Sequence, residues 1–194
     1  MHPAVLGITL MFGGISVAYP AVQNDPLPIT DPEAYKIYAS LLPQIGRDIG
    51  AKTLVLQRET ETYPRCMPSG GPLETEWRSV IDNYQRENSA VRFVLPEQPL
   101  QIQYAVIPSA RIQASFNDGV ARGWEEFYRQ YPDSGGSVQV SAVGFNALKT
   151  RALVYIGYHC GGRCGAGSHH LLEKIDGTWR EVALAGVTQC FWEA

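Results

Sequence analysis

Apolar residues recur at helical spacing, every three or four positions, in three stretches of the chain: residues 32–42, 73–88 and 118–131. Pro32 occupies a favoured first helical position, and Pro43 is expected to end the first helix because proline disrupts a helix interior. The apolar stripes of the second and third stretches are Trp77, Val80, Ile81 and Tyr84, then Val120, Trp124, Phe127 and Tyr131. The pattern therefore predicts two or three amphipathic helices.

Alternating apolar and polar positions predict strands between and after these helices. Thr53–Thr62 alternates as a half-buried strand does, and Val91–Val106 contains two shorter strand-like pieces. The turn Asp176-Gly177 predicts a two-residue hairpin, because such turns need positive φ angles. The predicted strands of the C-terminal half are Ser137–Phe145, Arg151–Cys160, Ser168–Ile175 and Thr178–Leu184.

These elements predict an α+β fold, with two to three helices packed on an antiparallel sheet whose C-terminal half is a β-meander. Residues 32–194 are expected to form one domain, because no composition shift divides them and their length suits one domain. Residues 19–31 contain three prolines among polar residues, which is typical of an extended linker.

The N-terminal residues resemble a secretory leader. The apolar run Ala4–Val17 is shorter than the about 20 residues that a helix needs to cross a bilayer. Ser16-Val17-Ala18 supplies the small-x-small pattern that signal peptidase recognises, so residues 1–18 are predicted to be a signal peptide. A retained membrane anchor and a buried structural helix are the alternatives. The favoured location is the periplasm, cell surface or extracellular space, with membrane contact only if the leader is retained.

Composition narrows the range of partners. Hydrophobic residues make up 45% and charged residues 18% of the chain, which is typical of a globular protein. The formal net charge is −3, and no basic cluster occurs along the chain. Nucleic acid is therefore not an expected partner, since phosphate binding needs a basic surface.

The four cysteines are predicted to form disulfides, because an even count in an exported protein favours them. We favour a local bond between Cys160 and Cys164 and a long-range bond between Cys66 and Cys190. The sequence alone leaves all three possible pairings open, and the hairpin cysteines could instead be thiol ligands of a metal.

The C-terminal half also carries a recognisable motif. Val143-Gly144-Phe145-Asn146 is followed by Cys160-Gly161 and Cys164-Gly165, and the pattern closes with Asp176-Gly177 and Trp179. This resembles exported bacterial proteins of uncharacterised function that share a Cys-Gly-x-x-Cys-Gly hairpin. The resemblance implies export and the hairpin, and it implies no activity or functional residues.

A metal site is the sharpest chemical hypothesis. His159, His169 and His170 lie within twelve residues of one another, beside two cysteines, and imidazole and thiolate are ligands of zinc and copper. If the loop spans Gly161–Gly167, His159 lies directly opposite His169, close enough to share a metal. Against this, His169 and His170 point to opposite faces of a regular strand. Glycines in this segment are expected to adopt positive φ: Gly161, Gly162, Gly165 and Gly167.

Catalytic patterns are weaker. Asp133-Ser134-Gly135-Gly136 is similar to the sequence around the serine of trypsin-like proteases, but the only histidine before Ser134 is His2 in the leader. Glu59 and Glu61 share a strand face, and Glu125 and Glu126 lie on a helix, where exposed carboxylates are common. We therefore expect no catalytic or cofactor-binding residue among these positions.

Three functions remain possible from the sequence. The favoured one is a non-enzymatic exported protein that binds another protein or belongs to a cell-envelope or extracellular assembly. The second is a metal-binding protein that uses the hairpin 159–170 for zinc or copper. The third is an enzyme with dispersed catalytic residues.

Overall fold

The computed structural model describes residues 26–62, 64 and 66–194. The predicted signal peptide therefore lies outside the described residues. The helices of the described part are α1 (Pro32–Asp48), α2 (Gly71–Glu74), α3 (Arg78–Glu87), α4 (Ser109–Ala114) and α5 (Val120–Gln130). The predicted α+β class is confirmed, and α4 is a short helix that periodicity does not predict.

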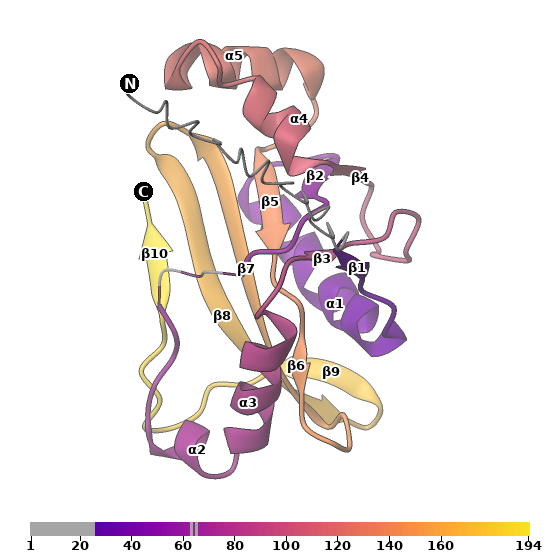
Figure 1. Cartoon of the computed structure of the whole chain (residues 1–194), viewed down its shortest axis with the longest axis vertical. Helices are drawn as coiled ribbons and strands as arrows, with labels where there is room; N and C mark the ends of the chain where they lie inside the picture. The colour runs from indigo at the N-terminus through magenta and orange to yellow at the C-terminus, as the bar shows by residue number, and fades with distance from the viewer. Residues whose placement is uncertain (1–25, 63, 65) are drawn as a thin grey trace, which may run out of the picture.

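The strands form one large twisted sheet and one small one (Figure 1). The large sheet has the order β10-β8-β7-β5-β2-β4, with β6 added beside β7 and β9 beside β8. Its strands are β2 (Leu54–Gln57), β4 (Tyr104–Ile107), β5 (Ser137–Val140), β6 (Gly144–Phe145), β7 (Arg151–Gly161), β8 (Cys164–Ile175), β9 (Thr178–Glu181) and β10 (Phe191–Glu193). The small sheet pairs β1 (Leu27–Pro28) with β3 (Arg92–Phe93).

Most of the large sheet is antiparallel, and the exception is β2. This strand lies between β4 and β5 and runs parallel to both. The antiparallel C-terminal meander is confirmed: β7, β8 and β9 follow one another, and β10 returns along the free edge of β8. Asp176 and Gly177 both have positive φ, as the predicted two-residue turn requires.

The helices cover both faces of the sheet. α1 packs against the face that carries Leu54, Val138 and Val154, and this contact is the largest apolar core. α3 covers the opposite face, where Trp77 and Tyr84 pack near Leu153, Leu171 and Tyr155. α4 and α5 lie at the far end of the molecule from α2 and α3 (Figure 1) and enclose a third cluster.

Two sequence-based helix boundaries need correction, and one helix was not predicted. α1 continues through Pro43 to Asp48 because Ile45 and Ile49, beyond the proline, still pack on the core. The predicted helix 73–88 is divided into α2 and α3, and Trp77 at the division is fully buried. α4 escaped prediction because it is a six-residue helix with one buried residue, Ile112, too short to show periodicity.

Candidate functional site

The hairpin of β7 and β8 is longer than the sequence indicates. β7 extends to Gly161 and β8 begins at Cys164, so only Gly162 and Arg163 form the turn. Cys160 and Cys164 are disulfide-bonded across it, as expected. The ladder has a register shift between His159 and Gly161, which places Cys160 at an irregular position of its strand.

This register overturns the expected histidine pair. His159 lies opposite Gly165, whereas His169 lies opposite Tyr155, which precedes His159 by four residues in β7. Strand residues rise by about 3.3 Å each, so the two imidazoles are separated by far more than a shared ligand sphere allows. Within residues 26–62, 64 and 66–194, no three His, Cys, Asp or Glu side chains gather at metal-binding distance. A metal site at His159, His169 and His170 stays a prediction, and the distance between His159 and His169 argues against it.

The three histidines occupy three different environments. His159 is exposed and lies against the Trp192 indole, with ring centroids 5.0 Å apart. His170 points to the opposite face of the sheet, where Nδ1 lies 2.7 Å from a carboxylate oxygen of Glu181. The buried histidine is His169, which is only 3% exposed.

His169 is held between two tyrosines. Its ring centroid lies 5.5 Å from that of Tyr84, on α3, and 5.3 Å from that of Tyr155, on β7. Neither ring nitrogen has a hydrogen-bond partner. Burial, and to a lesser degree repulsion from His170, lowers the pKa of His169 to about 4, so the imidazole is neutral at physiological pH. A buried neutral ring of this kind contributes packing rather than proton transfer.

The sequence suggests that the glycines of the hairpin adopt positive φ, and this expectation is wrong. Gly165 and Gly167 instead make room for neighbouring side chains. None of Gly161, Gly162, Gly165 and Gly167 has positive φ. A β-carbon on Gly167 would lie 2.2 Å from the Tyr155 hydroxyl and 2.5 Å from Trp192 Nε1. A β-carbon on Gly165 would lie 3.2 Å from the Trp192 ring. These two glycines therefore leave room for the Trp192 side chain over β8.

A small pocket of about 140 Å³ opens beside Trp192. Its lining comes from β5, β7 and β10 and from Glu61 and Pro64, and its polar side chains are Glu61, Gln139, Tyr155 and His159. At this size the pocket is smaller than the several hundred Å³ that a small-molecule site occupies.

The second disulfide anchors the C-terminal strand. Cys66 is bonded to Cys190, across 124 residues of sequence, as the sequence analysis favours. Cys190 is buried, and its carbonyl accepts a hydrogen bond from the His169 amide. The bond therefore ties the segment before α2 to the edge of the sheet beside β8.

A groove lies beside α3 and has a volume of about 620 Å³. Its lining comes from α3, from the segment Pro28–Asp31 and from the chain between Ala142 and Lys149. Its apolar lining residues are Ile29, Ala34, Ala142, Val143 and Phe145. We call this depression the α3 groove.

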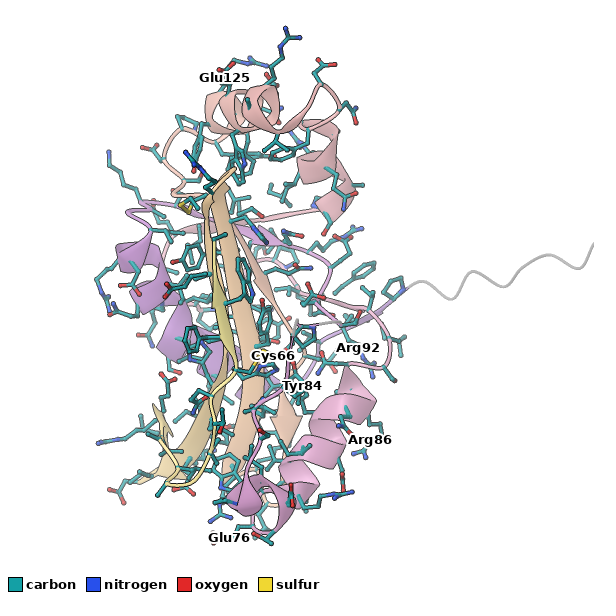
Figure 2. The ribbon with its side chains drawn as sticks, turned by 90° about the vertical axis from the view of Figure 1, so that its left-hand side faces the viewer. Cys66, Glu76, Tyr84, Arg86, Arg92 and Glu125 are labelled. Atoms are coloured by element: carbon teal, nitrogen blue, oxygen red, sulfur yellow. A yellow bond between two sulfur atoms is a disulfide. The ribbon has the colours of Figure 1, made fainter. Side chains whose placement is uncertain are left out.

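Ion pairs neutralise most of the charge on the α3 groove. Lys149 binds Asp31 at 2.6 Å, and Arg92 binds Glu87 at 3.1 Å. Asp82 is paired with Arg78 at 2.9 Å. Arg86, on the last turn of α3, is the remaining charged residue of the lining, and it has no ionic partner among the described residues. Figure 2 shows Arg86 on the side of α3 away from Tyr84, which points toward the sheet.

The described carboxyl groups whose pKa shifts are resolved all shift downward. Lys174 and Lys36 lower the pKa of Glu33 to about 2. Hydrogen bonds from Ser109 and Arg58 outweigh burial and lower the pKa of Glu59, and His170 lowers that of Glu181. Downward shifts are typical of structural ion pairs, whereas a general acid needs a raised pKa.

The remaining sequence candidates have structural roles. Ser134 is buried, and its hydroxyl donates to the Tyr131 carbonyl at the turn after α5. Glu59 accepts a hydrogen bond from the Ser109 amide, at the start of α4. Glu126 pairs with Arg129 along α5, and Glu125 is exposed on the same helix.

Sequence reasoning missed the α3 groove. Its walls come from three segments that are far apart in the sequence and meet only in the fold, so no local motif marks it. One signal was available: Ser79, Asn83 and Arg86 are spaced i, i+4 and i+7 on the stripe of α3 that does not carry its apolar residues.

Comparison with protein-family models, curated proteins and solved structures finds no match to this chain. No helix in the described residues is long and apolar enough to span a membrane.

Proposed function

We propose that this chain is exported and acts as a non-enzymatic binding protein, whose α3 groove takes an extended segment of another protein. The observation that carries this proposal is the groove itself, a depression of about 620 Å³ beside α3. Its lining combines apolar residues with polar and charged ones, as protein-binding surfaces do.

Two exposed leucines, each adjacent in sequence to a lining residue of the groove, support a protein as the occupant. Leu27 is 64% exposed and precedes the lining residue Pro28, and Leu148 is 82% exposed between the lining residues Ala147 and Lys149. Exposed apolar side chains beside an apolar groove enlarge the surface that a partner can cover. A small molecule inside the groove would leave both leucines in water.

The two disulfides support export, because such bonds persist in oxidising compartments. The leader predicted for residues 1–18 supports it independently. An intact mass of the protein recovered from its native compartment tests this part: we expect residues 19–194 less four hydrogens. A full-length mass with free thiols would contradict export.

A blocked groove tests the binding part of the proposal. Ala147 is exposed and lines the groove, so Ala147→Trp fills it without disturbing the core. Ala121→Trp makes the same change on α5, at the other end of the molecule. In extracts of the native compartment, we expect the wild-type chain and A121W to sediment as a complex and A147W to sediment as a monomer. Identical sedimentation of all three proteins would contradict the proposed role of the groove.

A further inference from the structure

We infer that the α3 groove recognises a carboxylate on its peptide ligand and that Arg86 binds this carboxylate; this inference rests on the proposed binding function. Its basis is an imbalance between hydrogen-bond donors and acceptors on the groove wall. The acidic side chains of the lining already have partners, whereas several donors do not.

Each carboxylate of the lining has a partner within the protein. Asp31 accepts hydrogen bonds from the Glu33 amide and from Lys149. Glu87 accepts from Arg92, and Asp82 accepts from Arg78. The amide oxygen of Asn83 accepts from the backbone of Phe145, at 2.7 Å. A ligand that brings donors would therefore meet acceptors that are already bound.

The donors lie on one stripe of α3. Ser79, Asn83 and Arg86 are successive groove-lining positions on one side of the helix. The Ser79 hydroxyl, the Asn83 side-chain NH₂ and the Arg86 guanidinium have no hydrogen-bond partner in the part of the chain that the structure describes. A row of unpaired donors that ends in a cation is complementary to an acceptor with negative charge.

A carboxylate fits this row better than other anions on a peptide segment without modification. The guanidinium can bind both oxygens of a carboxylate at once, and such charge-assisted pairs are stronger than neutral hydrogen bonds. The apolar lining residues Ile29, Val143 and Phe145 would contact the side chains next to the acidic residue. The ligand class is therefore an acidic peptide segment with apolar neighbours.

Peptide titration tests this inference. Two series of fluorescein-labelled hexapeptides share apolar positions, and one series carries Asp or Glu where the other carries Asn or Gln. They are titrated by fluorescence anisotropy against the disulfide-bonded protein and two variants. Arg86→Gln removes the proposed contact, and Arg180→Gln makes the same change at an exposed residue of β9 that is not part of the groove.

We expect the acidic series to bind at least ten-fold more tightly than the amide series, and Arg86→Gln to abolish that difference. Arg180→Gln should leave it unchanged. Equal binding of acidic peptides to the wild-type protein and Arg86→Gln would overturn the inference.

The other outcomes separate this inference from the proposed function. If both series bind equally and Ala147→Trp abolishes the binding, the groove binds peptides but does not recognise a carboxylate. If free succinate displaces acidic peptides at the affinity of the peptides themselves, the ligand is a small acid, and the peptide assignment is wrong. If neither series binds, both the inference and the proposed role of the groove fail.

Discussion

Trp192 Nε1 donates a hydrogen bond of 2.7 Å to the hydroxyl of Tyr155. The contact spans three strands, because β8 lies between β10, which carries Trp192, and β7, which carries Tyr155. The indole can cross β8 only because Gly167, directly paired with Trp192, has no side chain. The C-terminal strand is therefore fixed to the sheet by a side-chain contact in addition to its three backbone pairs.

Gly167→Ala should destabilise the protein, since its β-carbon would displace both Tyr155 and Trp192. We expect a loss of about 2 kcal/mol in the free energy of unfolding, measured by urea denaturation, which is typical of overpacking. Gly162→Ala is the matched control in the same hairpin, because its β-carbon would lie 3.5 Å from Val120, an ordinary contact. Equal stability of the two variants would contradict the packing role of Gly167.

The two disulfides should differ in their contribution to stability. The Cys66–Cys190 bond spans 124 residues and the Cys160–Cys164 bond spans 4. By loop entropy, replacing the first pair with alanine should cost about 4–5 kcal/mol and replacing the second about 2 kcal/mol. Urea denaturation of the two double variants measures this, and a larger loss from the hairpin pair would contradict the entropic account.

His169 should make stability depend on pH between neutrality and pH 4.5. Its pKa is about 4 in the folded protein and 6.5 ordinarily, so the unfolded chain binds a proton first as pH falls. The protein should therefore lose about 2 kcal/mol of unfolding free energy between pH 7 and pH 4.5. His169→Phe, which keeps an aromatic ring between Tyr84 and Tyr155, should remove this loss. If the unfolding free energies of the wild type and His169→Phe change in parallel with pH, the pH dependence does not come from His169.

Glu33 should stabilise the contact between α1 and the meander. Its carboxylate binds Lys174 on β8 and Trp179 on β9, each at 2.8 Å. Because its folded pKa is lowered to about 2, this contribution is present above pH 4.5 and is lost as pH falls toward 2. Glu33→Gln should lower the free energy of unfolding by about 2 kcal/mol at pH 7. This is less than the lowered pKa of Glu33 would give by itself, because solvent screens the exposed Lys36 partner.

A control for Glu33→Gln lies on α5. Glu126→Gln removes an exposed pair with Arg129, and we expect no measurable change in the unfolding free energy. If both variants are as stable as the wild type, Glu33 does not hold α1 to the meander.

Sequence patterns predicted the elements that depend mainly on residues close together in the chain. The stripe of Trp77, Val80 and Tyr84 marked α3 because these residues face one apolar cluster. Asp176-Gly177 marked its turn because both residues adopt positive φ. The same local logic failed for Gly165 and Gly167, which resemble loop residues in sequence but lie in β8 to make room for aromatic rings.

Apart from the Cys66–Cys190 disulfide, long-range relationships could not be predicted. The parallel pairing of β2 with β4 and β5 depends on crossovers that the alternation of side chains does not encode. The α3 groove depends on contacts such as Lys149 with Asp31, which are 118 residues apart. The histidine cluster failed for a related reason, because a change of hairpin register separates His159 from His169 while the sequence spacing stays the same.

The most direct test of the proposed binding function is photo-crosslinking in the cells that make the protein. A photoreactive phenylalanine replaces Ser79, which is exposed on the groove wall, or Gln85, which is exposed on the same helix but does not line the groove. We predict one discrete protein adduct at position 79, none at position 85, and loss of the adduct when Ala147→Trp is added. Equal adducts at both positions, or no adduct at either, would contradict the account.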